Sequence, residues 1–188
     1  MFFESSHDLL DISPTHYPLR QKPIIYQSQD TVLDAPFKLE DYNRPCALWV
    51  SNPTWANHIP LLGSAGLKIE EYPYYDYDSH SVKFDEMIEC LSKIGSGDVV
   101  LLHGCCHNPC GADLSREQWQ QIRDVALKQG FTVFIDLAYQ GLGDGLEEDV
   151  YGTRLLAETL PELIIVSSCS KNFGLYRERT GAMTMISD

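Results

Sequence analysis

Apolar residues occur in short continuous runs, separated by polar turns and by segments with helical spacing. The runs predict strands, several of them typical of strands buried on both faces of a parallel sheet, over residues 47–50, 67–72, 98–103, 131–136, 163–167 and 181–187. The intervening segments predict helices over residues 84–94, 115–129 and 147–160. The alternation predicts an α/β fold, a mostly parallel sheet flanked by helices, with a ligand site at the carboxyl ends of its strands.

The helix over 115–129 has the clearest boundaries. Ser115 and Gln118 stand three residues apart, as in a capping box, and Gly130 provides a left-handed stop.

The first 44 residues follow a different pattern. Five of the ten prolines fall in this stretch or directly after it, at positions 14, 18, 23, 36 and 45, whereas all 13 glycines lie at or after Gly63. This stretch also mixes polar residues without a clear period. We therefore expect an irregular or foreign segment over residues 1–44 and the folded domain over residues 45–188.

Composition narrows the function classes. With 188 residues, 44% hydrophobic and 22% charged, the chain is expected to form one globular domain. Its net charge of −13 and the absence of a basic block argue against nucleic acid and anionic membranes as partners. Neither a basic signal-peptide start nor a membrane-length apolar run is present in the sequence, so we expect a cytoplasmic protein.

Six cysteines stand at positions 46, 90, 105, 106, 110 and 169. Without a secretory signal this spacing favours reduced thiols over disulfides. The cluster 105–110 has the composition of half a zinc site, which would require a second pair of soft ligands. The remaining cysteines are single, so we expect no metal and interpret the cluster as small residues at a strand end.

Polar residues follow three consecutive predicted strands. Asn108 comes after the first, Asp136 and Tyr139 after the second, and Ser168 and Lys171 after the third. Each has an ordinary interpretation as a turn residue, a cap or a solvated lysine. Because parallel strands bring their carboxyl ends to one edge, a shared ligand explains the group better.

Four segments resemble the motifs of class I pyridoxal-phosphate aminotransferases. Residues 168–179 (SCSKNFGLYRER) resemble the family's cofactor-lysine signature, and residues 103–111 (HGCCHNPCG) resemble its Asn-Pro-Thr-Gly turn. Residues 134–141 (FIDLAYQG) resemble its Asp/Tyr strand end, and residues 52–58 (NPTWANH) its aromatic cofactor loop. The resemblance begins near Leu48 and is strongest to bacterial aspartate and aromatic amino-acid aminotransferases.

The resemblance implies the large domain of the fold type I transferases, pyridoxal 5'-phosphate as cofactor, and transamination between an amino acid and 2-oxoglutarate. It implies that Lys171 binds the cofactor covalently and then transfers a proton as general base and acid. Asp136 would keep the cofactor's pyridine nitrogen protonated. His58 would support Asp136 from behind, unless it is an ordinary polar loop histidine.

The other expected cofactor contacts come from the same motifs. By resemblance, Tyr139 and Asn108 would donate hydrogen bonds to the oxygen on the cofactor ring, and Trp55 would stack on its face. Ser168 and Arg179 would bind the phosphate. Cys110 replaces the usual threonine of the turn, and we assign it no role.

The family's other parts are not recognisable in the sequence. Members of the family are longer and carry an upstream phosphate loop, a tyrosine that reaches the partner subunit, and a small domain with the arginine for the substrate carboxylate. We therefore expect an incomplete large domain without the small domain and with impaired activity. Members form homodimers; dimerisation of this chain and its preference for aspartate or aromatic substrates are left open. The alternatives are an inactive cofactor-binding fragment, another pyridoxal-phosphate reaction, or a non-enzymatic zinc module.

Overall fold

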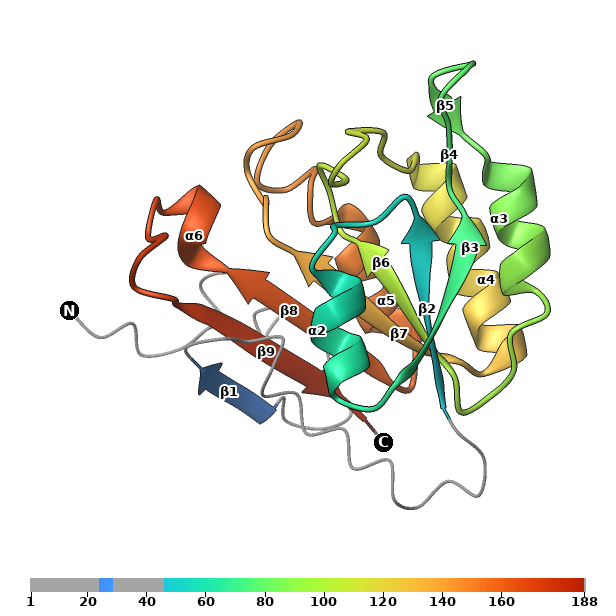
Figure 1. Cartoon of the computed structure of the whole chain (residues 1–188), viewed down its shortest axis with the longest axis horizontal. Coiled ribbons are helices and arrows are strands. Elements are labelled where there is room, and N and C mark those ends of the chain that lie inside the picture. The colour runs from blue at the N-terminus through green and yellow to red at the C-terminus, as the bar shows by residue number, and fades with distance from the viewer. Residues whose placement is uncertain (1–23, 29–45, 188) are drawn as a thin grey trace.

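A seven-stranded mixed sheet forms the centre of the structure, a computed structural model that describes residues 24–28 and 46–187 (Figure 1). Its strands are β1 (Ile24–Ser28), β2 (Ala47–Asn52), β3 (Lys68–Pro73), β6 (Val99–His103), β7 (Thr132–Leu137), β8 (Leu163–Ser168) and β9 (Gly181–Ile186). Their order across the sheet is β1-β9-β8-β7-β6-β2-β3. The five central and right-hand strands from β8 to β3 run parallel, and β9 and β1 are antiparallel to their neighbours. This confirms the predicted mostly parallel sheet.

Helices cover both faces of the sheet. They are α2 (His58–Ser64), α3 (Phe84–Leu91), α4 (Arg116–Gln129), α5 (Tyr151–Thr159) and the short α6 (Cys169–Asn172). Helices α3, α4 and α5 pack on one face against Val100 and Leu102, whereas α2 packs on the other face, where Val99 and Leu101 belong to the core. Successive residues of β6 thus point to opposite faces, and all four are buried, which explains its continuous apolar run.

Helix α4 confirms its predicted boundaries. The Ser115 side chain accepts a hydrogen bond from the backbone N–H of Gln118, the Gln118 side chain accepts one in return, and Gly130 ends the helix at a φ of 74°. Helix α5 starts later than predicted, at Tyr151 instead of residue 147. The reason is that the carboxylate of Asp149 binds the preceding loop, which keeps residues 147–149 out of the helix.

Five elements were not predicted from the sequence pattern. Strand β1 lies inside the stretch that we expected to be irregular, and its partner β9 is far away in the sequence, so no local pattern indicates the pairing. The rest of residues 1–44 lies outside the described residues. Helix α2, helix α6 and the hairpin of β4 (Tyr75–Asp76) and β5 (Ser81–Val82) are too short for a clear period. None of the described helices has the length and apolar character needed to cross a membrane.

Close contact between α4 and α5 leads to a stability prediction. A Cβ at Gly152 would lie 2.3 Å from Trp119 Cδ2, within the helix-helix contact. We expect Gly152→Ala to lower the free energy of unfolding by about 1–3 kcal/mol, because the core cannot accommodate the extra methyl group. The control is Gly63→Ala in α2, where the nearest atom would be 3.9 Å away. Urea denaturation of both variants checks the difference, and equal stability would contradict the packing argument.

Candidate functional site

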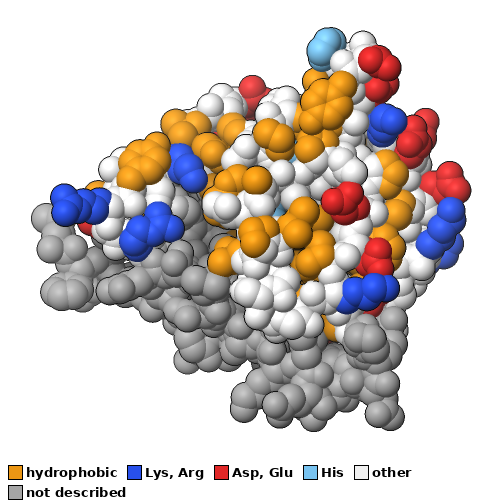
Figure 2. All heavy atoms as spheres, in the orientation of Figure 1, with side chains coloured by type: hydrophobic (Ala, Val, Ile, Leu, Met, Phe, Trp, Pro, Cys, Tyr) orange, Lys and Arg blue, Asp and Glu red, His pale blue; other side chains and the backbone are white. Residues whose placement is uncertain are grey.

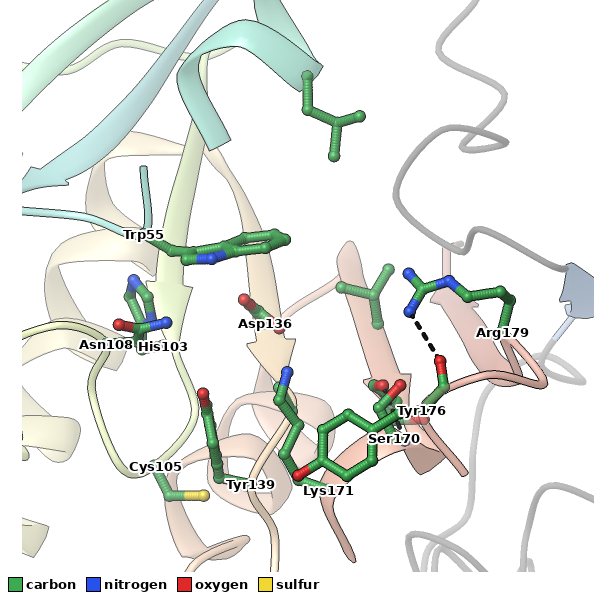
Figure 3. A pocket seen from close by; sticks show the side chains of 15 residues that line it. Trp55, His103, Cys105, Asn108, Asp136, Tyr139, Ser170, Lys171, Tyr176 and Arg179 are labelled. Atoms are coloured by element: carbon green, nitrogen blue, oxygen red, sulfur yellow. Dashed lines mark hydrogen bonds between the residues drawn. The ribbon is translucent and has the colours of Figure 1, made fainter. Parts of the chain in front are cut away.

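A pocket lies at the carboxyl edge of the parallel strands and contains seven of the predicted site residues. They are Trp55, Asn108, Asp136, Tyr139, Ser168, Lys171 and Arg179. In Figure 3, Trp55 extends across one side of the pocket, and the amine of Lys171 points toward Asp136. The residues come from segments that are far apart in the sequence, so the shared strand edge brings them together as predicted.

Asp136, at the end of β7, is the anionic group of this pocket. Its Oδ2 atom lies 3.1 Å from Nε2 of His58, whose side chain is buried. Burial raises the pKa of the Asp136 carboxyl, but the hydrogen bond with His58 and the charges of His103, His58 and Lys171 outweigh it and hold the pKa below its usual range. Asp136 therefore stays ionised at neutral pH and favours a positively charged partner in the pocket. His58 lies behind Asp136, where we expected it.

Behind Asp136 the hydrogen bonds continue to residues that the sequence analysis did not single out. Thr54 Oγ1 lies 2.8 Å from Nδ1 of His58 and 3.3 Å from Nε2 of His103. The ring of His103 in turn lies 4.0 Å from that of His107, which stacks on Tyr74. The sequence feature that could have identified both residues is their position, since Thr54 lies in the aromatic cofactor loop and His103 at the end of a predicted strand. Thr54 links two histidines and restricts how His58 can turn.

The buried imidazoles make stability sensitive to acid. Burial lowers the pKa of His103 to about 4, and burial with the charge of His103 lowers that of His107 to about 3, from an ordinary value of 6.5. Between the ordinary value of 6.5 and these lowered values, the unfolded chain binds protons that the folded chain does not. The free energy of unfolding therefore falls as the pH falls below about 6.5. We expect a loss on the order of 2 kcal/mol per histidine at pH 5.

Urea denaturation at pH 7.5, 6 and 5 measures this loss. His107→Gln should reduce the pH dependence, whereas His80→Gln, at an exposed position on the β4–β5 hairpin, should not. Identical pH dependence of the two variants would show that His107 is not the acid-sensitive group.

Lys171 is placed by the short helix α6. Ser168 caps this helix, since its Oγ accepts a hydrogen bond from the backbone N–H of Ser170 at 3.1 Å. The Nζ atom of Lys171 lies 5.0 Å from the centre of the Tyr139 ring. Burial and the charge of Asp136 raise the pKa of Tyr139, so its hydroxyl stays protonated and can donate a hydrogen bond. An amine, a carboxylate and a phenol therefore meet in one pocket.

One end of the pocket is cationic, although the chain is acidic overall. The segment from α6 to β9 contains Lys171, Arg177 and Arg179, and Figure 2 shows Lys and Arg side chains gathered there. The guanidinium of Arg179 donates to the backbone oxygen of Tyr176 at 3.4 Å. The backbone of Arg179 has a φ of 52°, which is a left-handed conformation. In residues other than glycine this conformation is often found at ligand sites. With the Ser168 hydroxyl, this end suits an anion.

The turn that carries Asn108 is held from outside the pocket. The carboxylate of Asp113 accepts hydrogen bonds from the backbone N–H groups of Cys106 and His107 at 2.7 and 2.8 Å. Cys110 Sγ lies 3.1 Å from Nδ1 of His107, and Nε2 of that ring lies 2.9 Å from Ser51 Oγ. Burial raises the pKa of the Cys110 thiol, which therefore stays protonated. Cys110 thus supports His107 in the turn and does not line the pocket.

The structure changes the set of residues that could form a zinc site at the cysteine cluster: the third candidate ligand is an aspartate and not a further cysteine. Among the described residues, Cys105, Cys106 and Asp149 place ligand atoms within 4.8 Å of one another. Each oxygen of Asp149, however, already accepts two backbone N–H groups. A carboxylate with its in-plane lone pairs occupied is a poor ligand for a cation, so the structure does not favour zinc here.

Comparison with known proteins agrees with this geometry. Residues 20–188 match the family model described as aminotransferase class I and II. The match begins inside the stretch expected to be irregular and before the expected start near Leu48. The chain is 51% identical over 141 residues to an aromatic-amino-acid aminotransferase of Paracoccus denitrificans, a match that covers 75% of this chain and 36% of that protein. It is 51% identical over 139 residues to the aspartate aminotransferase of Escherichia coli K12, with coverage of 74% and 35%.

Solved structures have the same fold. An aromatic-amino-acid aminotransferase from Burkholderia pseudomallei, covalently bound to pyridoxal phosphate, superimposes with a TM-score of 0.88 at 37% identity, covering 97% of this chain and 46% of that one. This chain therefore spans about a third of the length of the two relatives named above and a little under half of the solved chain. The four motifs, the pocket at the strand ends and the family match agree, and the chain belongs to the class I and II aminotransferases.

Proposed function

We propose that this chain contains the cofactor-binding part of a pyridoxal-phosphate-dependent aminotransferase. The observation that carries the proposal is the placement of the Lys171 amine near the ionised Asp136 in a pocket lined by Trp55. In domain terms, residues 45–188 are proposed to be part of the large domain.

The residues present fit the cofactor chemically. An anionic carboxylate suits a protonated pyridine nitrogen, and a flat indole suits the face of an aromatic ring. The amine of Lys171 suits an aldehyde, to which a lysine can attach covalently. Ser168 Oγ accepts from Ser170 N–H, so its own hydrogen remains available to a phosphate oxygen, beside Arg179.

When bound, the cofactor's ring accepts the electron pair left at an amino acid's Cα after the proton is removed. We assign the removal and return of that proton to Nζ of Lys171, acting as general base and acid. Asp136, held ionised by His58, would keep the proton on the ring nitrogen. Thr54 and His103 would hold His58 in the orientation that Asp136 requires.

The remaining pocket residues would orient the ring. The protonated hydroxyl of Tyr139 and the amide of Asn108 would donate hydrogen bonds to its oxygen substituent, and Trp55 would cover one face. Ser168 and Arg179 would bind the phosphate. Together these contacts would place the substrate's Cα next to Lys171, which is the positioning that transamination needs.

The proposed substrates are an amino acid, aspartate or aromatic, and a 2-oxo acid such as 2-oxoglutarate. The relatives named above include both an aspartate and an aromatic-amino-acid enzyme, so the proposal does not choose between them. A homodimer is the proposed assembly of the whole enzyme.

Stereospecific exchange tests the proposal. The protein and the cofactor are incubated in D₂O with L- or D-aspartate and L- or D-tyrosine, and loss of the α-proton is followed by NMR. We expect faster exchange of an L-amino acid than of its mirror image, because free cofactor cannot distinguish them. Equal rates for both forms, at the rate of free cofactor, would contradict the proposed function.

Net turnover should nevertheless be slow in this chain. It covers only 36% of the length of its Paracoccus relative, and precise substrate positioning contributes about 7–11 kcal/mol to such reactions. A coupled assay with aspartate or tyrosine and 2-oxoglutarate measures it. A rate of roughly 1–1000 per second, ordinary for an enzyme, would show that the chain itself supplies the groups that we assign to other parts.

A further inference from the structure

Asp149, just before α5, binds a whole loop through its carboxylate. The side chain accepts hydrogen bonds from the backbone N–H groups of Gly141 (2.8 Å), Gly143 (2.9 Å), Asp144 (2.8 Å) and Gly145 (3.3 Å). The residue is only 7% exposed. Each oxygen of this carboxylate accepts two of the four N–H donors, and an amide side chain, with a single acceptor oxygen, could not satisfy them all.

The loop held by Asp149 begins directly after the pocket residue Tyr139. The backbone N–H of Leu142 donates to the backbone oxygen of Tyr139 at 3.0 Å, and the side chain of Gln140 donates to the backbone oxygen of Leu146 at 3.1 Å. Asp149 itself does not line the pocket. Asp149 is therefore linked to the pocket through the backbone that leads to Tyr139, and its carboxylate also lies within 4.8 Å of the thiol of the pocket residue Cys105.

Other described contacts do not replace this carboxylate. The backbone N–H of Asp149 donates to the oxygen of Gly145 at 3.0 Å, which closes the loop but leaves its other N–H groups to the side chain. Apolar side chains cover the loop only in part: Leu146 lies against Gly141 but is 64% exposed, and Leu142 is 56% exposed. With little apolar packing, hydrogen bonds to Asp149 dominate the stability of the loop.

We propose that Asp149 is a positioning residue that sets the place of the Tyr139 ring, and hence of its hydroxyl, in the pocket. The effect of Asp149 on cofactor binding rests on the proposed function, because Tyr139 is the proposed hydrogen-bond donor to the cofactor. The structural part of the inference, the coupling of Asp149 to Tyr139, concerns only residues of this chain.

Two independent substitutions test the coupling. Asp149→Asn replaces one acceptor oxygen by an N–H₂ group that faces backbone donors. Gly143→Ala leaves Asp149 in place but would put a Cβ 2.7 Å from its Oδ1 atom, which displaces the carboxylate. The control is Asp98→Asn, because Asp98 is also 7% exposed and also accepts a backbone hydrogen bond, from Ala47 N–H at 3.2 Å. It lies at the opposite edge of the sheet, next to β6.

The first readout needs no ligand. The full chain is labelled with 3-fluorotyrosine, and the ¹⁹F resonance of Tyr139 is assigned by its loss in Tyr139→Phe. We expect this resonance to shift or broaden in Asp149→Asn and in Gly143→Ala but not in Asp98→Asn. Amide exchange over residues 141–145 should become about tenfold faster or more, as the loss of hydrogen bonds to a charged group implies. An unchanged Tyr139 resonance in either folded variant would overturn the inference.

The second readout uses pyridoxal phosphate as the probe. Asp149→Asn should weaken its binding relative to Asp98→Asn, and the loss should disappear in a Tyr139→Phe background, because both substitutions act on one contact. An equal loss in both backgrounds would overturn the positioning role. Absence of binding to the unsubstituted chain would instead contradict the proposed function, and the ¹⁹F result would still decide the coupling.

Discussion

Replacing Lys171 by alanine is expected to reduce the exchange of an L-amino acid's α-proton to the rate of free cofactor. The substitution removes the covalent attachment point and the general base at once. General acid-base catalysis alone contributes about 10²–10⁴-fold, so the loss should be at least of that size. The pocket itself should remain, because Lys171 lies in α6, whose cap is formed by Ser168 and not by the lysine.

A surface lysine provides the matched control. Lys93 is exposed and pairs with Glu89 on the outer side of α3, remote from the strand-end pocket. Lys93→Ala should leave exchange unchanged, and both variants should unfold at similar urea concentrations. Exchange that survives in Lys171→Ala but not in Lys93→Ala would rule out Lys171 as the proton-transferring residue.

Asp136→Asn is expected to leave covalent attachment at Lys171 largely intact and to slow α-proton exchange by about 10²–10³-fold, the usual cost of removing one electrostatic partner from a reacting system. An amide cannot hold a proton on the cofactor's ring nitrogen as an anion does, so the ring accepts electrons less readily. Attachment is measured by absorbance and exchange by NMR in D₂O.

His58→Phe measures the contribution of the His58 hydrogen bond separately from that of the Asp136 carboxylate itself. It keeps the charge of Asp136 but removes the hydrogen bond that, with nearby charges, keeps the pKa of Asp136 low. We expect a smaller loss of exchange than in Asp136→Asn, and one that grows as the pH falls, because the Asp136 carboxyl is then protonated at a higher pH. For the Asp136→Asn variant of the preceding prediction, unchanged exchange would mean that Asp136 is only a turn residue with no role in the reaction.

The parts of the fold that were predictable depend on local chemistry. The boundaries of α4 follow from Ser115, Gln118 and Gly130, and the runs of β6 and β7 follow from burial on both faces. In contrast, the start of α5 depends on where Asp149 finds its N–H donors, and β1 depends on a distant partner strand. Neither is visible in a local pattern.

The site also contains residues that could be predicted from the sequence and residues that could not. Residues that carry a chemical signature, such as Asp136 and Lys171, could be selected from the motifs, and the structure places them in one pocket. Thr54 and His103 act through His58, so their significance depends on side-chain distances that the sequence does not contain. Asp149 was missed because a carboxylate that binds backbone amides has no distinguishing neighbours in the sequence.

The most direct test of the central claim is the location of the covalently bound cofactor. The 188-residue protein is incubated with pyridoxal phosphate, reduced with borohydride, digested, and its peptides are mapped by mass spectrometry. The account predicts one dominant label, on Lys171, which disappears in Lys171→Ala. A label distributed over exposed lysines such as Lys68 and Lys93, with no excess at Lys171, would contradict it.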